Sequence, residues 1–395
     1  MIGHNVDVVC VNSEYYEEPL SWELSDLVDP RCNVFTTKAF GIGPVRLVGD
    51  IGIRGAWFLY RECLKLIRRK QIDFIWISVP SYYVGLLGRL IQLKTSIPYA
   101  IDYIDPWVRN NDTRKGWRFS LTNYLAKFLE PIVVKRAAII SGVSKSYIMP
   151  VLMRNFVFSN DREEVWLEKG GSHTTHELVF PYGYDEHDYN QLSNESRQEK
   201  VWLYAGAFMP RARAVVRAFL QAIATLEKAQ RWDDGIKISF VGTGQYQGES
   251  IAEMAETLGI DHILEESRER IPYTEVLKEL AKSDSILLFG STEAHYTPSK
   301  VFQSLLASRP IVGALHSKSD GLDILKDCGA AKYVVKISEG DDLKEKFIKV
   351  LIERLQESEW KTDLSPIAEY RVEETAKKAE KVIRQVLVTR KSRSH

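Results

Sequence analysis

The sequence predicts an α/β protein built from two doubly wound domains, and three observations lead to this prediction. First, a chain of 395 residues is longer than one typical core can organise. Second, short continuous apolar runs, which are typical of buried parallel strands, alternate with helical patterns almost throughout. Third, a polar stretch at 190–200 interrupts the alternation, which then restarts. Two series of strands and helices separated by a polar joint indicate two such domains.

The expected strands form one series on each side of that joint. They are 6–11, 74–79, 98–102 and 137–143 in the first series, and 201–206, 236–242, 285–290, 310–315 and 331–336 in the second. We expect a first domain over 1–192, a second over 200–362, and a last helix over 366–388 that crosses back to the first domain. The carboxyl ends of both sets of strands should face one cleft, so functional residues are expected just after strands.

Composition excludes several classes of protein. Lys and Arg (53) balance Asp and Glu (53), so no net field favours a nucleic acid. The 4 cysteines form no CxxC pair, and no signal peptide or membrane-spanning run is visible, which indicates a cytosolic protein. The 8 histidines have no metal-ligand spacing. Because GxSxG, Walker A and intact GxGxxG motifs are also missing, we expect no metal, no cofactor, and no hydrolase, kinase or dehydrogenase.

The stretch GSTEAHYTPSKVFQSLLASRPIVG, 290–313, follows an apolar strand and contains a short helix. Thr297 suits the N-cap and Pro298 the first helical position, so Ser299 and Lys300 should lie in the first turn, whose free N–H groups attract anions. A lysine there opposes the helix dipole unless a bound phosphate reverses the sign. We interpret Lys300 as a phosphate ligand; the alternative is a solvated lysine on an ordinary turn.

Two further glycine turns follow strands of the second series. In YAGAFMPRARAV, Gly206 is followed by Arg211 and Arg213, and arginines at a strand-to-helix turn suit phosphate binding. In FVGTG, Gly242 and Gly244 allow the backbone to approach a base or ribose closely. Each turn alone is a weak signal, since arginines commonly decorate exposed first turns. Together with the turn at Lys300, they favour a site at this edge of the sheet for a phosphate and a base or ribose.

In the first series, IDYIDPW at 101–107 follows a strand and places carboxylates at the predicted cleft. Asp105 is the candidate to act as a base or to orient an acceptor hydroxyl, although an Asp before Pro is also a common turn residue. We interpret Asp102 as structural. The segment 54–71 combines basic and aromatic residues, so it is either a helix that lies on anionic lipid or an ordinary helix packed on the sheet.

Taken together, these residues resemble glycosyltransferases of the GT-B fold, in particular family 4 (group 1). Four stretches carry the resemblance: FPYGYDEHDY (180–189), YAGAF, FVGTG and VFQSLLASRPIVG. The versions with YTPSK and IDYIDPW are similar to the subgroup that builds bacterial surface polysaccharides. The resemblance implies that the second domain binds a nucleotide sugar, with basic residues on the diphosphate, and that the first domain binds the acceptor.

The sequence departs from that family in two respects. The family's Glu-x7-Glu pair falls on His295 and Gln303, and Gln303 can still hydrogen-bond ribose hydroxyls as a neutral group. MIGHNVDVVCV resembles the family's second strand, so the first strand and its glycine-rich loop are missing from the pattern. We expect either a further strand encoded upstream of Met1, or another segment or partner chain that covers the free edge of 6–11.

The leading interpretation is a cytosolic, metal-independent glycosyltransferase of polysaccharide biosynthesis. It would move a sugar from a nucleotide diphosphate donor to a glycan or lipid-linked acceptor, and retention of the anomeric configuration is implied by the resemblance alone. The donor site would comprise the glycine turns with Arg211, Arg213, His295, Thr297, Ser299, Lys300 and Gln303. Two alternatives stay open: a nucleotide-sugar-binding scaffold without turnover, and a nucleotide-sugar epimerase of similar shape.

Overall fold

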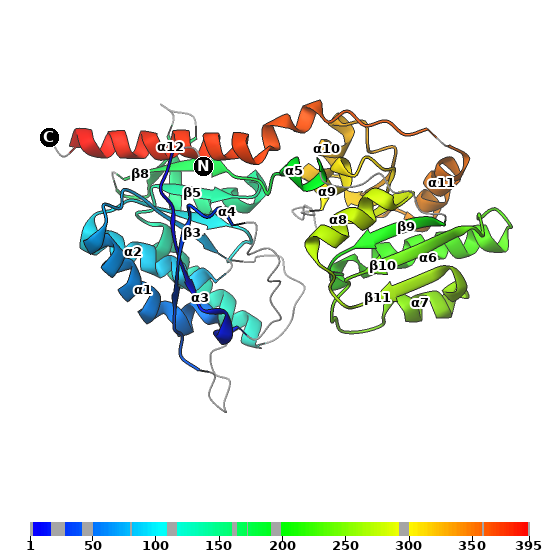
Figure 1. Ribbon diagram of the computed structural model, residues 1–395, viewed down its shortest axis with the longest axis horizontal. Helices are drawn as coiled ribbons and strands as arrows, with labels where there is room; N and C mark the ends of the chain where they lie inside the picture. Colours follow the sequence, from blue (N-terminus) through cyan, green and yellow to red (C-terminus); the bar gives the residue numbers. More distant parts are fainter. Residues whose placement is uncertain are drawn as a thin grey trace. The chain divides into compact units, whose positions relative to one another are not determined.

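The computed structural model describes residues 3–16, 28–41, 50–79, 81–108, 117–159, 164–171, 173–190, 199–291, 300–357 and 359–393. The chain divides into two compact units. The first combines Met1–Pro181 with Thr375–His395, and the second is Tyr182–Glu374. Each unit has a sheet with parallel strands and helices packed against it (Figure 1).

The second unit contains a six-stranded sheet in which every neighbouring pair is parallel. Its strands are β9 (Lys200–Ala205), β10 (Ile236–Val241), β11 (Leu264–Ser267), β12 (Ser285–Phe289), β13 (Ile311–His316) and β14 (Tyr333–Ile337). Their order, β11-β10-β9-β12-β13-β14, reads 3-2-1-4-5-6 when counted from β9, which is the doubly wound Rossmann order. The order therefore reverses between β9 and β12. All five predicted strands of this series are confirmed, and β11 is additional.

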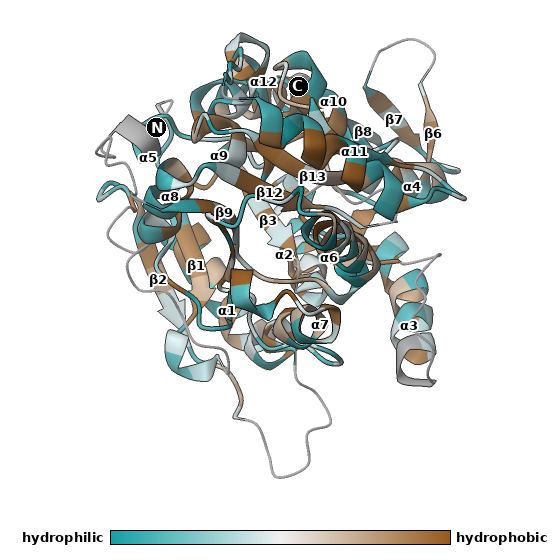
Figure 2. Ribbon diagram, turned by 90° about the vertical axis from the view of Figure 1, so that its right-hand side faces the viewer, coloured by the Kyte–Doolittle hydropathy of each residue, from teal (hydrophilic) through white to brown (hydrophobic). Residues whose placement is uncertain are grey.

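Helices cover this sheet because each carries one apolar face. They are α6 (Arg213–Lys228), α7 (Ile251–Leu258), α8 (Tyr273–Lys282), α9 (Val301–Leu306), α10 (Asp320–Asp327) and α11 (Leu343–Gln356), with short helices α5 (His187–Asn190), η4 (Pro210–Ala212), η5 (Asp261–Ile263) and η6 (Ser365–Tyr370). Phe219 of α6, Phe289 of β12 and Phe347 of α11 meet in the core with ring centroids 5.0–6.4 Å apart. The strands themselves are apolar, as β12 and β13 show in Figure 2.

The first unit has its strands in two separate sheets. The larger sheet has the order β3-β4-β5-β8-β7-β6, made of β3 (Ile75–Val79), β4 (Tyr99–Tyr103), β5 (Ile139–Gly142), β8 (Thr174–Val179), β7 (Val165–Glu168) and β6 (Phe156–Phe158). Its first four strands are parallel, and β7 and β6 are antiparallel additions. The smaller sheet pairs β1 (Asp7–Val11) with β2 (Asn33–Thr37) in parallel.

The prediction that 6–11 is a fully buried strand is wrong. Val8 and Val34 face each other in the β1–β2 register, and they are 40% and 51% exposed. The reason is that, within the described residues, β1 pairs only with β2, and no strand pairs with the outer edge of β3. The two sheets are joined instead by helices, since Val11 of β1 shares a core cluster with Leu59 of α1 and Leu87 of α2.

The remaining elements of the first unit are helical. They are η1 (Ser13–Tyr15), α1 (Ile51–Arg69), η3 (Tyr82–Val84), α2 (Gly85–Thr95), α3 (Trp117–Val134), α4 (Lys145–Asn155) and α12 (Val372–Arg393). α12, red in Figure 1, packs Ala379 and Val386 against Ile139 of β5 and Leu178 of β8. The C-terminal helix thus belongs to the unit that contains the N-terminal strands.

The division between the units falls at Pro181, earlier than residue 192 where the first domain was expected to end. Tyr184 explains this position. Its ring stacks on Phe302 of α9, and its backbone N–H donates to the Tyr370 carbonyl at 3.1 Å. These contacts attach the segment after Pro181 to the second unit.

Candidate functional site

The candidate site lies at the carboxyl ends of β9 and β12, where the strand order of the second sheet reverses. Gly206 follows β9 and Gly290 follows β12. Ligands of open α/β sheets bind at such a point because the loops from the two strands diverge there. The side chain of Lys300 reaches this point. Its Nζ lies 3.9 Å from the centroid of the Tyr204 ring in β9 and 3.5 Å from the Ala207 carbonyl oxygen.

The surroundings of Lys300 disfavour its own positive charge. Burial lowers the pKa of Lys300 from 10.5 to about 7. No carboxylate in the described part of the chain offsets this burial, and the face of Tyr204 attracts a cation less strongly than a carboxylate would. A half-buried cation that lacks a counter-ion among the described residues is suited to bind an anion, because a phosphate would supply the missing charge.

The predicted glycine turns come together beside this lysine. Gly206 (φ +104°) and Gly242 (φ +71°) both adopt backbone conformations that L side chains rarely allow. The N–H of Gly206 donates to the Val241 carbonyl at 2.7 Å, which ties the turn after β9 to the end of β10. A Cβ atom on Gly206 would lie 3.1 Å from Cε of Lys300. The absence of a side chain at Gly206 therefore provides the space that the Lys300 side chain occupies. Gly244 (φ +75°) belongs to the second turn, together with Gly242.

The two predicted arginines, Arg211 and Arg213, lie in different structural environments. Arg211 lies exposed in η4, and its role as a phosphate ligand stays a prediction. Arg213 begins α6, and its Nη2 donates to the backbone carbonyl of Gln247. Its guanidinium also lies 6.0 Å from the centroid of the Tyr246 ring. Arg213 is thus engaged in holding the loop that follows β10.

A buried glutamate that the sequence analysis missed organises the same loop. Glu266 of β11 accepts hydrogen bonds from the Thr243 hydroxyl at 2.7 Å, the Tyr246 hydroxyl at 2.6 Å and the Ala252 N–H at 3.1 Å. Burial and the bond to this carboxylate raise the pKa of Tyr246 to about 12. The Arg268 guanidinium lies 4.7 Å from the centroid of the Tyr246 ring. The Glu266 carboxylate therefore ties together several points of the loop after Gly242, in addition to the bond from Arg213.

Gln303 lies one turn after Lys300 and belongs to a chain of hydrogen bonds. Its side chain bonds to the Tyr273 hydroxyl, which in turn donates to Oδ2 of Asp188 at 3.1 Å. Burial, followed by the nearby Asp188 charge, raises the pKa of Tyr273 to about 12. Asp188 comes from the FPYGYDEHDY stretch, so the fold connects two segments that carried the family resemblance. A side chain held in this way presents a fixed polar group beside Lys300.

The start of α9 differs from the prediction. The structure begins the helix at Val301, with Lys300 as the N-cap. The reason is that the Lys300 carbonyl accepts the first helical hydrogen bond, from the Ser304 N–H at 2.9 Å. Pro298, the expected first helical residue, lies outside the described residues. His295, Thr297 and Ser299 lie outside the described residues. The Lys300 side chain, and not a helix terminus, is therefore the feature that indicates an anion site.

Asp105, the candidate of the first unit, lies partly buried in the turn after β4. Trp107 anchors this turn, because its ring stacks on Tyr82 at 5.4 Å and Tyr82 donates to the Pro106 carbonyl at 3.2 Å. Asp102 lies within β4 itself and accepts a hydrogen bond from Ser141 at 2.8 Å, which agrees with a structural role. The catalytic role of Asp105 stays a prediction.

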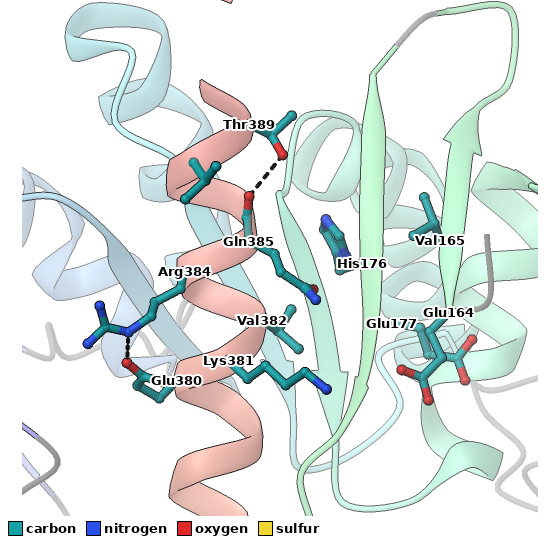
Figure 3. Close-up of a pocket in the computed structure, with 11 residues that line it drawn as sticks. Glu164, Val165, His176, Glu177, Glu380, Lys381, Val382, Arg384, Gln385 and Thr389 are labelled. Atoms are coloured by element: carbon teal, nitrogen blue, oxygen red, sulfur yellow. Dashed lines mark hydrogen bonds and ion pairs between the residues drawn. The ribbon is translucent and has the colours of Figure 1, made fainter. Parts of the chain in front are cut away.

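Two cavities of the first unit contain none of the predicted site residues. One, of about 680 Å³, lies between β8 and α12 and is lined by His176, Glu177, Lys381 and Gln385 among others (Figure 3). The other, of about 560 Å³, lies between the end of β2 and α1. In the part of the chain that the structure describes, no group of three or more His, Cys, Asp or Glu could hold a metal ion.

Comparison with solved structures identifies the architecture. The chain is similar to a UDP-forming α,α-trehalose-phosphate synthase from Burkholderia xenovorans, with a TM-score of 0.58 and 12% identity over 98% of this chain and 96% of that one. It is also similar to HepE from Anabaena, solved in complex with UDP and glucose, with a TM-score of 0.56 and 12% identity over 98% and 100%. The chain has the GT-B fold.

A third similar solved structure, trehalose-6-phosphate from E. coli bound with UDP-2-fluoro glucose, matches with a TM-score of 0.53 and 14% identity over 86% of this chain and 78% of that one. No family model and no curated protein sequence matches this chain. The predicted fold class is therefore confirmed. At these identities the likeness concerns the fold alone.

Proposed function

We propose that this GT-B protein is a glycosyltransferase whose second unit binds a nucleotide diphosphate sugar at Lys300. The observation that carries this proposal is the position of Lys300: a cation with a pKa of about 7, at the switch point of a Rossmann-ordered sheet, against the glycine turn that follows β9. The similar structures support it, because two of them were solved with UDP or a UDP-sugar analogue. In this proposal Gln303 bonds the ribose, and Arg211 adds positive charge.

The chemistry needs stabilisation of a leaving group. The bond between the anomeric carbon and the diphosphate oxygen breaks, and a bond to an acceptor hydroxyl oxygen forms. Negative charge grows on the diphosphate as it leaves, and Lys300 lies where it can stabilise that charge. Asp105 is proposed to orient the acceptor hydroxyl or to take its proton. Because a cationic side chain carries the charge stabilisation, we propose a metal-independent reaction that survives treatment with EDTA.

The finer parts of the proposal come from the sequence resemblance. They are a glycan or lipid-linked acceptor, a place in bacterial surface-polysaccharide synthesis and retention of configuration. A cytoplasmic location is proposed from the scattered cysteines and the lack of a visible signal peptide. The second candidate, a binding scaffold without turnover, is favoured by one observation: the family's second glutamate is Gln303, and this amide is bonded to Tyr273. Binding of a nucleotide sugar without transfer or hydrolysis would favour the scaffold, and release of an epimerised donor would indicate an epimerase.

The deciding experiment compares Lys300→Met with Lys349→Met, a variant of an exposed lysine on α11. We expect Lys300→Met to weaken binding of UDP or another nucleoside diphosphate by about 1.5–3 kcal/mol, the range for hydrogen bonds to charged groups. Isothermal titration calorimetry measures this affinity, and Lys349→Met should leave it unchanged. Equal affinities of all three proteins, with the fold intact, would remove Lys300 from the donor site.

A further inference from the structure

The helix α3 exposes an apolar stripe that the sequence analysis did not single out. Its exposed side chains include Tyr124 (69% exposed), Phe128 (64%) and Leu121 (51%), with Ile132 and Leu125 beside them at 42% and 39%. These positions recur at intervals of three, four and seven residues, so they share one face of the helix. Contiguous exposed apolar surface of this kind is rare on soluble monomers and marks an interaction site.

The orientation of α3 is set by its opposite face. Ala126, Val133 and Val134 are buried in the core of the first unit. Glu130, also buried, accepts bonds from Nε and Nη2 of Arg154, both at 2.9 Å. Turning the helix to hide its apolar stripe would break this buried ion pair and expose the core residues. The stripe is therefore a stable feature of the surface.

The exposed charge on the described part of α3 is positive. Among the described side chains of α3, the one carboxylate is the buried Glu130, whereas Lys127 is exposed. The neighbouring helix α2 packs against α3, contains no acidic residue and exposes Leu90 (49%) and Leu93 (63%). An apolar helix face flanked by lysine and free of exposed carboxylates is complementary to an anionic lipid surface.

The helix α1, which the sequence suggested for this role, contributes in a different way. Leu59 and Leu66 are buried, as an ordinary packed helix requires. Its outer face presents Trp57 (56% exposed) together with Arg61 and Arg68, which also line the cavity beside β2. This face is more basic and less apolar than that of α3. The basic residues of α1 can thus attract anionic lipid, but this helix exposes few apolar side chains that could insert into the membrane.

We propose that the apolar face of α3 docks on the surface of a membrane that contains anionic lipid. Tyr124 and Phe128 would enter the interface between headgroups and acyl chains, while Lys127 would stay at the phosphates. A second copy of the chain fits this face less well. Two stripes brought together would juxtapose lysines without exposed carboxylates on α3 to pair with them. No helix of the described chain is long and apolar enough to cross a membrane.

Vesicle sedimentation at low salt tests the proposal on the full chain. We expect the protein to sediment with phosphatidylglycerol-containing vesicles and much less with neutral phosphatidylcholine vesicles. The double variant Tyr124→Ser/Phe128→Ser should reduce the partition coefficient by about tenfold or more, since two aromatic side chains no longer enter the interface. Lys127→Gln should lower binding to anionic vesicles by about fivefold and leave binding to neutral vesicles unchanged.

The matched control is Val388→Ser, because Val388 is 68% exposed on α12 of the same unit but stands apart from the α3 stripe. This variant should bind vesicles as the wild type does. Wild-type binding by the double variant, or no binding by the wild type, would overturn the proposal. A concentration-dependent dimer in analytical ultracentrifugation that the double variant loses, without vesicle binding, would assign the face to a second copy and also overturn it. Nucleotide affinity, measured in parallel, reports the donor site separately.

Discussion

The two units use the same strand–helix repeat, yet one sheet is continuous and the other is split. In the second unit six parallel strands are paired edge to edge, and the strand order reverses once, between β9 and β12. In the first unit β1 and β2 form their own sheet, and helices bridge the separation from β3. The comparison teaches that the second unit is a complete Rossmann unit, whereas the first unit relies on helix packing where its described strands do not pair.

The strands of the two units also differ in how far their side chains are buried. Val312 of β13 and Val34 of β2 both sit in parallel strands, but the first is fully buried and the second is 51% exposed. A strand with a paired neighbour on each side and a helix on each face buries nearly every side chain. A strand at an open edge leaves side chains in water. Substitutions of similar chemistry should therefore have unequal effects in the two units.

The largest expected effect is on Gly313 of β13. A Cβ atom there would lie 1.9 Å from the Leu288 carbonyl oxygen of β12, and this backbone atom cannot move without breaking the sheet. We expect Gly313→Ala to lower the free energy of unfolding by about 4 kcal/mol or more. Urea denaturation measures this, with Gly41→Ala as the control, because a Cβ on Gly41 of the first unit meets no atom within 4 Å. A stability loss no greater than that of the control would contradict the continuous, tightly packed sheet.

The second largest effect is the change of nucleotide affinity with pH at the proposed donor site. A diphosphate prefers the protonated form of Lys300, whose pKa is about 7, so affinity should fall as pH rises from 7 to 9 by up to about tenfold per pH unit. Isothermal titration calorimetry between pH 7 and 9 measures this affinity. Lys300→Met should remove this part of the pH dependence, and Lys300→Arg should bind with little dependence because arginine stays charged. A wild-type profile parallel to that of Lys300→Met would rule the lysine out.

The same lysine links stability to pH in the ligand-free protein. Its pKa falls from 10.5 to about 7 on folding, so the unfolded state binds more protons between these values. Stability should therefore rise with pH from 7 towards 10.5, and the contribution of Lys300 should be least favourable below pH 7. Thermal unfolding of the wild type and of Lys300→Met at pH 7 and 9 gives the comparison. If the stability of the two proteins depends on pH in the same way, the lowered pKa of Lys300 is contradicted.

The smallest effect is expected from matched valine substitutions. Val312→Thr places a hydroxyl in the buried sheet of the second unit and should cost about 1–3 kcal/mol of stability. Val34→Thr changes an exposed side chain and should stay within about 0.5 kcal/mol of the wild type. Denaturation midpoints measure both. A large loss of stability in Val34→Thr would show that the open face of β1–β2 is covered in solution. The two sheets would then differ less in side-chain burial.

The sequence by itself determined the fold class, most strands and the position of the candidate lysine. Continuous apolar runs such as 310–315 are typical of buried strands, and glycine at 206 and 242 marks turns that other residues avoid. These signals are local, so they can be read without a structure. The strands that were missed, such as β2, β7 and β11, are short or carry polar residues, and they become strands only through pairing with a neighbour.

Only the tertiary structure decided which side chains meet. It links Gln303 through Tyr273 to Asp188, engages Arg213 with the loop after β10, and places Lys300 against the ring of Tyr204. It also left the apolar face of α3 in water, although its residue types resemble those of a buried helix. The physical reason is that burial and charge pairing depend on neighbours distant in sequence. The pKa of Lys300 and the exposure of α3 are properties of those neighbours and not of the local pattern.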